Sequence, residues 1–304
     1  MTRVAAIDCG TNSLRLLVSD LDGGTKHDLH REMRIVRLGR GVDRTGSLSP
    51  EALARTRAAL LDYAATCREL GVEVTRMVAT SATRDASNQA DFVAMVHAIL
   101  GAGPDVVSGE QEAALSFTGA TAGLDGSTGP FLVIDIGGGS TEFVIGTGDV
   151  TAACSVDVGC VRLTERHLTS DPPTPAQIAA AETDVDTALT LVHDVVPVEQ
   201  ARTVLGLAGS VTTVAAHALA LPSYDPAVIH LARLSAADVR RAATSLLSMS
   251  CVQRAGLPYM HPGRVDVIGA GALVLRRLVE RLDLAEIVVS EADILDGIAW
   301  SMSP

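Results

Sequence analysis

The chain has 304 residues, more than one hydrophobic core usually organises, so we expect two domains. Its net charge of −12 argues against nucleic acid or an anionic membrane as a partner, and no apolar stretch approaches the length of a membrane span. The five cysteines lack CxxC or Cys/His spacing, which predicts buried, reduced thiols rather than disulfides or structural zinc. An N-terminus without an apolar secretory region predicts a cytoplasmic protein.

The first half of the chain alternates strand and helix signals. Val4–Ser19 predicts a strand, a tight turn at Cys9–Ser13 and a return strand. Ser49 as N-cap, followed by Pro50, predicts the start of a helix that ends before Gly71. Further strands are expected at Arg31–Leu38, Thr75–Thr80 and Asp105–Val107, and further helices at Asn88–Leu100 and Gly109–Gly119.

The second half repeats the beginning after a Gly-, Ser- and Thr-rich stretch at Gly123–Pro130. Phe131–Val144 again shows an apolar run, an Asp, a Gly-rich turn and a second apolar run. Two copies of one unit predict two domains of similar α/β architecture. The remaining signals are a turn at Asp171–Pro175 leading into a helix to about Val195, helices up to Ser250, a helix ending at Arg281, and strands at Val204–Leu207, Val265–Ile268 and Ile287–Val289.

The two turns, Asp8–Ser13 and Asp135–Thr141, carry the strongest chemical signal. Each places an Asp at a strand end, then glycine, then hydroxyl residues. Successive backbone N–H groups in such turns form an anion-binding concavity, and glycine lets the ligand come close. An Asp would repel phosphate but can hold Mg²⁺, directly or through water, and the ion then bridges phosphate oxygens. Two matched turns favour phosphate bound between two domains over the alternative of two plain hairpins.

With these motifs, the sequence resembles the exopolyphosphatase and guanosine pentaphosphate phosphohydrolase family of the actin-like, sugar kinase and Hsp70 ATPase superfamily. The resemblance spans essentially the whole chain and is carried by Ile7–Val18, Ile134–Gly146, Ala79–Ala86 (ATSATRDA), Val107–Ala113 (VSGEQEA), Gly159–Glu165, Gly206–Ser210 and Gly269–Gly271. It implies an α/β fold of two actin-like, ribonuclease H-like domains flanking an interdomain cleft. These domains would be residues 1–124 and 125–304, with the C-terminal helix 294–304 a candidate addition to the first.

The resemblance also implies which residues act. Glu112 falls on the catalytic glutamate, which would accept the proton of the attacking water. Glu110 is the competing residue, but only Glu112 directly precedes the matching Ala113. Glu142 would orient the water or serve as a second metal carboxylate. The expected phosphate-binding residues are Gly10, Thr11, Asn12, Ser13, Arg84, Gly137, Gly138, Gly139, Ser140 and Thr141, and the expected ligands of Mg²⁺ (or Mn²⁺) are Asp8 and Asp135.

Other features leave their roles open. Arg31, Arg34, Arg37, Arg40 and Arg44 form either a basic patch for an anionic substrate or an ordinary solvated face. Arg15 either contacts substrate or points outward from its strand. The loop Gly206–Ser210 is similar to the nucleotide-base loop of the superfamily, and we assign it no catalytic role. For His261 we favour a local structural role over a metal-binding one.

The resemblance implies a homodimer that hydrolyses the terminal phosphate of linear polyphosphate, preferring short chains, with guanosine pentaphosphate as the alternative substrate. Two other functions are less favoured. A kinase of the same superfamily would need a pocket for the phosphate acceptor. A non-catalytic sensor would gain nothing from four carboxylates (Asp8, Glu112, Asp135 and Glu142) beside a bound anion. One departure concerns Leu295, which stands where the family often has arginine. Any contact made by that arginine is absent here.

Overall fold

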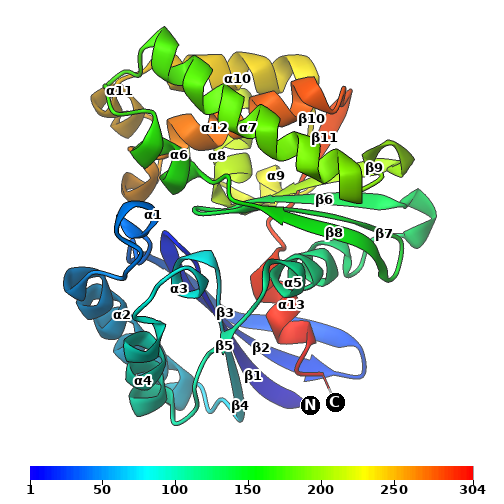
Figure 1. Cartoon of the computed structure of the whole chain (residues 1–304). Helices are drawn as coiled ribbons and strands as arrows, with labels where there is room; N and C mark the ends of the chain where they lie inside the picture. The colour runs from blue at the N-terminus through cyan, green and yellow to red at the C-terminus, as the bar shows by residue number, and fades with distance from the viewer. Residues whose placement is uncertain (304) are drawn as a thin grey trace. The chain divides into compact units, whose positions relative to one another are not determined.

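The computed structural model describes residues 1–303, which form two compact units (Figure 1). The first unit contains Met1–Gly119 together with residues 294–303, and the second contains Ala120–Asp293. No helix among the described residues is long and apolar enough to cross a membrane. All five cysteines are free thiols; Cys9, Cys67 and Cys160 are buried as expected, whereas Cys154 and Cys251 are half-buried.

The first unit is built on a five-stranded sheet in the order β3-β2-β1-β4-β5. Strand β2 is antiparallel to its neighbours β1 and β3, whereas β1, β4 and β5 run parallel to one another. This mixed sheet with helices fits the α/β class that the sequence predicts. The strands are β1 (Thr2–Cys9), β2 (Ser13–Asp22), β3 (Thr25–Ile35), β4 (Val74–Ala79) and β5 (Asp105–Val106).

Both faces of this sheet are covered, because successive side chains of a strand point to opposite faces. On one face Ala5 and Ile7 join a core with helices α2 (Pro50–Glu69) and α4 (Gln89–Leu100). On the other face Val4 and Ala6 join the C-terminal helix α13 (Ile294–Trp300), beside α5 (Gly109–Thr121), as Figure 1 shows. The side chain of Ser49 accepts the N–H of Ala52, which confirms its predicted role as the N-cap of α2. The short helices α1 (Val42–Thr45) and α3 (Ser81–Arg84) complete the unit.

The second unit repeats the same arrangement with one additional strand. Its sheet has the order β10-β11-β9-β6-β7-β8, in which β7 is antiparallel to β6 and β8, and β6, β9 and β11 are parallel. The strands β8-β7-β6-β9-β11 therefore correspond to the five of the first unit, and β10 is added at the edge. The strands are β6 (Phe131–Ile136), β7 (Thr141–Gly146), β8 (Val150–Val156), β9 (Thr203–Leu207), β10 (Arg233–Ser235) and β11 (Glu286–Val289).

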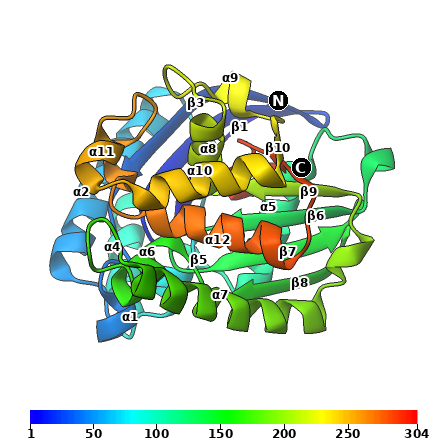
Figure 2. The same cartoon turned by 90° about the horizontal axis from the view of Figure 1, so that it is seen from above.

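Helices cover this second sheet with one large apolar core. Helix α12 packs between α7 and α10 and also contacts α6 and α8, and the row α7, α12, α10 is seen in Figure 2. Leu132 and Ile134 of β6 contribute to that core. The helices are α6 (Cys160–Arg166), α7 (Pro175–Val195), α8 (Ala208–Ala218), α9 (Pro226–Ile229), α10 (Ala236–Ser248), α11 (Cys251–Ala255) and α12 (Ile268–Arg281).

One predicted strand is wrong. Val265–Ile268 is not a strand but the lead into α12, after a short 3₁₀ turn at Pro262–Arg264. A short apolar run cannot be assigned by periodicity alone, and here Ile268 is buried as the first residue of a helix. Strands β8 and β10 were not predicted, and β3 begins at Thr25 rather than at Arg31. Exposed residues dilute the alternation of these edge strands.

Candidate active site

The first unit gathers its predicted site residues at the carboxyl ends of parallel strands, where α/β sheets commonly bind ligands. Asp8 is near the end of β1 and is only 3% exposed. It lies directly opposite Arg15 of β2, and the Arg15 guanidinium donates to its Oδ2 from Nε (2.8 Å) and Nη2 (2.7 Å). Arg15 is therefore bound to the predicted metal carboxylate rather than pointing outward.

Glu112 and Arg84 meet at the neighbouring strand ends. Glu112 lies in the first turn of α5, is 9% exposed, and its Oε2 accepts a bond from Arg84 Nη1 at 3.2 Å. The same Nη1 donates to the carbonyl of Val107 at 3.1 Å, which orients the guanidinium from the end of β5. Glu110 is exposed. Of the two competing glutamates, Glu112 is thus the one that contacts another predicted site residue.

The first Gly-rich turn is closed by a bond from the Gly10 N–H to the Ser13 carbonyl at 3.0 Å. The Thr11 hydroxyl is bonded to the hydroxyl of Ser81 at 2.8 Å, and both residues are buried. This bond ties the turn to α3, the helix that carries Arg84. Ser81 lies within the family-like segment Ala79–Ala86, but no residue pattern singles it out there.

The second Gly-rich turn has the same closing bond, from the Gly137 N–H to the Ser140 carbonyl at 3.0 Å. The carbonyls of Gly137 and Gly138 accept N–H groups from the start of α6 (Cys160 to Gly137 at 3.0 Å, Val161 to Gly138 at 2.9 Å). In contrast, the N–H groups of Gly138 and Gly139 contact no acceptor within the described part of the chain. The turn therefore offers donors and not acceptors, which is the polarity required to bind an anion.

A pair of carboxylates lies beside this second turn. Asp135 of β6 and Glu142 of β7 are directly opposite each other in the antiparallel register, and such pairs place side chains on the same face. Both are buried, with exposures of 7% and 1%. Glu142 Oε1 accepts a bond from the Ser155 hydroxyl at 2.7 Å. Two carboxylates on the same face of a sheet are a donor set that can hold a divalent cation.

A divalent cation held at these carboxylates would have limited protein coordination. Within residues 1–303 no cluster of three or more His, Cys, Asp or Glu residues has the arrangement of a metal cage. Mg²⁺ is often bound by one or two carboxylates together with water and substrate phosphates, so a pair such as Asp135 and Glu142 is sufficient. Asp8 is less available for direct coordination because Arg15 already binds its Oδ2.

Several other residues have structural contacts. The Thr141 hydroxyl donates to the carbonyl of Val158 at 2.6 Å, so one predicted phosphate donor is engaged within the protein. His261 Nδ1 accepts the N–H of Gly263 at 3.0 Å, a local cap consistent with the structural role that we favoured. Leu295 is 1% exposed and belongs to the apolar core between α13 and the first sheet. Arg162, not singled out from the sequence, donates from Nε to the Gly139 carbonyl at 2.7 Å.

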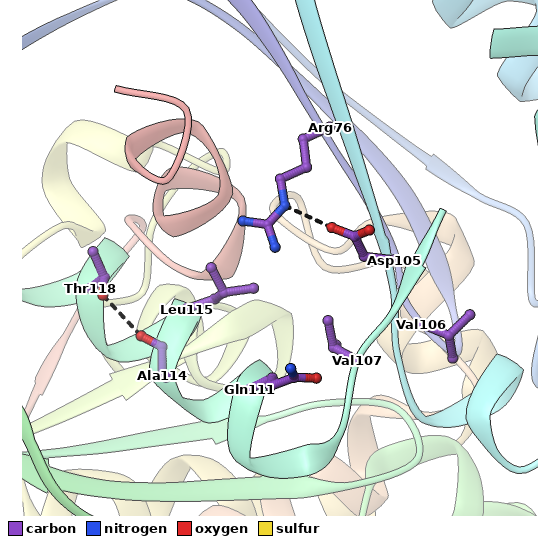
Figure 3. A pocket seen from close by; sticks show the side chains of 8 residues that line it. All are labelled: Arg76, Asp105, Val106, Val107, Gln111, Ala114, Leu115 and Thr118. Atoms are coloured by element: carbon purple, nitrogen blue, oxygen red, sulfur yellow. Dashed lines mark hydrogen bonds and ion pairs between the residues drawn. The ribbon is translucent and has the colours of Figure 1, made fainter. Parts of the chain in front are cut away.

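A separate pocket of about 600 Å³ lies in the first unit, beside α5 (Figure 3). Gln111, Leu115 and Thr118 of α5 line it opposite Arg76 and Asp105. The Arg76 guanidinium donates to Asp105 Oδ2 at 2.9 Å, so the only basic side chain of the lining is paired. Neither Glu112 nor Arg84 lines this pocket, and we do not assign the active site to it.

The fold and the two turns define a class, the two-domain α/β proteins with a matched Gly-rich turn in each domain. Known proteins narrow that class. The sequence profile described as the Ppx/GppA phosphatase family matches residues 17–304. A protein named exopolyphosphatase 2 from Mycobacterium tuberculosis is 51% identical, over 100% of this chain and 99% of its own length. A guanosine-5′-triphosphate,3′-diphosphate pyrophosphatase from Vibrio cholerae is 40% identical over 54% of this chain and 33% of its own.

A solved structure agrees with these sequence matches. The crystal structure of an exopolyphosphatase-like protein superimposes with a TM-score of 0.95 and 41% identity, covering 98% of both chains. The chain described here belongs to the Ppx/GppA phosphatase family. It is accordingly a hydrolase, and the sequence-based recognition of the family and of the fold class is confirmed.

Proposed function

We propose that this protein is an exopolyphosphatase that removes the terminal phosphate of linear inorganic polyphosphate, with short chains preferred. The full-length similarity to exopolyphosphatase 2 supports the substrate class. The observation that supports the reaction most directly is the contact of buried Glu112 with Arg84 at the sheet edge. This contact places Glu112, which can accept a proton from water, beside the Arg84 guanidinium, which can bind phosphate oxygens.

In this proposal the residues divide the work as follows. Glu112 orients the attacking water and accepts its proton, while Arg84 holds Glu112 and a phosphate oxygen. The backbone N–H groups of Gly138 and Gly139 bind phosphate oxygens, and the corresponding turn at Gly10–Ser13 contributes further donors. A Mg²⁺ ion, when bound, neutralises developing charge on the phosphates. Asp135 with Glu142 would hold that ion, and Asp8 would act through a water molecule.

A second candidate substrate is guanosine pentaphosphate, which the same residues would hydrolyse at its terminal 5′-phosphate. The match to the guanosine pyrophosphatase of Vibrio cholerae favours this alternative, although it covers only about half of this chain. We further propose that the protein acts in the cytoplasm as a homodimer and binds neither nucleic acid nor membrane. Its net charge of −12 supports the last point.

The test is orthophosphate release in the presence of Mg²⁺ from tripolyphosphate, long polyphosphate and guanosine pentaphosphate in parallel. Glu112→Gln should lower turnover about 10²–10⁴-fold on the preferred substrate while leaving the fold intact, because it removes the base but keeps the shape. Glu110→Gln is the matched control, since Glu110 is exposed and two residues away. Equal loss in both variants would contradict the assignment of Glu112.

The substrate comparison, together with an assay that contains polyphosphate and ADP, has four informative outcomes. Dominant release from polyphosphate supports the exopolyphosphatase, and dominant release from the nucleotide supports the alternative. Binding of all three without release from any would make the protein a sensor. Phosphate transfer from polyphosphate to ADP would instead identify a kinase.

A further inference from the structure

The arginine-rich segment of the first unit separates into two groups. Arg31 is paired with Asp296 at 2.6 Å, and Arg34 with Glu32 at 2.7 Å, so their charges are balanced within the unit. Arg40 and Arg44 are exposed and have no acidic partner within 4 Å among residues 1–303. The segment 37–44 contains three arginines and one aspartate, which makes it basic in a chain of net charge −12.

This basic segment is attached directly to the first Gly-rich turn. The N–H groups of Val36 and Arg37 both donate to the carbonyl of Asn12, at 3.0 and 2.8 Å, and the N–H of Gly39 donates to the carbonyl of Thr11 at 2.8 Å. A Cβ on Gly39 would lie 2.3 Å from Thr11 Cγ2, so only glycine allows so close an approach. Arg40 therefore directly follows Gly39, whose backbone is bonded to the first Gly-rich turn.

The segment is also held in one conformation. Arg37 has a φ of 51°, in the left-handed region that non-glycine residues rarely occupy. The Arg55 side chain of α2 donates from Nε to the carbonyl of Val36 at 2.9 Å, and this bond holds the backbone at the start of the segment. At the other end, the Gly46 carbonyl accepts the N–H of Ser87 at 2.8 Å. A backbone fixed at both ends presents its arginines with less loss of entropy than a free loop would.

The equivalent segment of the second unit is different. After β8, Arg162 also approaches its Gly-rich turn, but it donates to the Gly139 carbonyl and lies 3.5 Å from Asp157. The Arg162 guanidinium therefore contacts acceptors within the protein. The two units share the attachment of this segment to the turn. Among residues 1–303, the first unit adds Arg40 and Arg44, which have no acidic partner within 4 Å, just beyond that attachment.

We propose that Arg40 and Arg44 form a binding subsite for phosphates farther along the polyphosphate chain than the one that is hydrolysed. This inference rests on the proposed function and names residues that would favour chains of more than three phosphates over tripolyphosphate, whatever the upper limit of the preferred length. Each guanidinium provides planar donors that suit phosphate oxygens, and the ligand is a linear polyanion of more than three phosphates. A tripolyphosphate, which has only two phosphates beyond the terminal one, would depend on this subsite less than a long chain does.

The experiment compares the double variant R40A R44A with the wild type and with R68A. Arg68 is exposed on the same helix as Arg55, thirteen residues further on and thus about 20 Å along the helix axis. We measure kcat/KM for tripolyphosphate and for chains of tens of phosphates at several salt concentrations. The expected result is that the ratio of long-chain to tripolyphosphate kcat/KM falls about tenfold in R40A R44A, with a weaker salt dependence for long chains. R68A should keep the wild-type ratio.

The outcomes separate this inference from the proposed function. A wild type that hydrolyses polyphosphate, with an unchanged ratio in R40A R44A, overturns the subsite and leaves the exopolyphosphatase standing. An equal loss on tripolyphosphate and long chains also overturns it, because the arginines would then act at the terminal phosphate. If the wild type releases no phosphate from any polyphosphate, the proposed function fails. The subsite is then decided by measuring the affinity for long polyphosphate of Glu112→Gln with and without R40A R44A. A lower affinity in the combined variant supports the subsite, and the same affinity in both variants contradicts it.

Discussion

The two units of the molecule have the same sheet, the same turn and different chemistry beside it. In both, a glycine N–H donates to a serine carbonyl three residues later at 3.0 Å, and N–H groups that follow the third strand hold the turn carbonyls. The residue opposite the aspartate differs. Asp8 faces Arg15, whereas Asp135 faces Glu142.

This difference shows which part of a repeated unit is structural and which part is free to vary. Backbone hydrogen bonds and close glycine contacts define the turn in both copies, because its shape depends on the main chain. The cross-strand side chain is not needed for that shape. In the first unit it balances a buried charge, and in the second it adds another, so we expect a cation to depend on the second unit more strongly than on the first.

The largest expected effect comes from changing these facing residues. Glu142→Gln should raise the Mg²⁺ concentration for half-maximal activity about 10–100-fold, because it removes one of two paired carboxylates. Arg15→Met should instead lower the free energy of unfolding by about 3 kcal/mol, since it removes the guanidinium that binds the buried Asp8 carboxylate. Mg²⁺ titrations of activity and urea unfolding measure the two effects.

A matched double variant sharpens this contrast. D8N R15M removes both charges, and it should recover part of the stability that Arg15→Met loses. If Arg15→Met shifts the Mg²⁺ requirement as far as Glu142→Gln does, the two hairpins share one chemical role and the comparison fails.

A smaller effect is expected at the glycines that press on the two turns. A Cβ on Gly159 would lie 2.4 Å from the Gly138 carbonyl oxygen, which is backbone, whereas a Cβ on Gly39 meets the side-chain methyl of Thr11. Gly159→Ala should therefore destabilise the protein more than Gly39→Ala, both within about 1–3 kcal/mol. Thermal unfolding gives the order. Adding Thr11→Ser, which deletes the methyl group, should restore part of the loss in Gly39→Ala and none in Gly159→Ala.

A pH-dependent effect of similar or smaller size tests how the C-terminal helix completes the first unit. Burial alone would raise the pKa of the Asp296 carboxyl, but Arg31 and Lys26 outweigh it and hold this pKa below its ordinary value. A lowered carboxyl pKa stabilises the fold above the unfolded value of about 3.9, and the contribution is lost as the pH falls. Asp296→Asn should therefore cost about 2 kcal/mol at pH 7 and less at pH 3.

Urea unfolding of wild type and variant at both pH values measures this difference. Asp149→Asn, at an exposed position of the second unit, is the control and should change stability little at either pH. If Asp296→Asn lowers the free energy of unfolding as much at pH 3 as at pH 7, the ion pairs of Asp296 do not hold helix α13 to the sheet.

Much of the fold was predictable because its signals are local. The strand–turn–strand pattern at Asp8 and at Asp135 follows from apolar runs and glycines within about fifteen residues. The start of α2 is predicted by Ser49 as N-cap and Pro50 as the first helical residue. Val265–Ile268 was misassigned because four apolar positions do not distinguish a strand from the start of a helix. Edge strands such as β10 escaped prediction because half-exposed residues give weak alternation.

The primary structure determined the two matched turns, the family and the candidate residues Glu112, Arg84 and Glu142, since these depend on residue types at fixed spacing. Tertiary structure decided which side chains meet. The contact of Arg84 with Glu112 and that of Thr11 with Ser81 join segments 28 and 70 residues apart, and no local pattern encodes them. Likewise, only strand register shows that Arg15 faces Asp8 and that Glu142 faces Asp135, because a shift of one residue would send each side chain to the other face of its sheet.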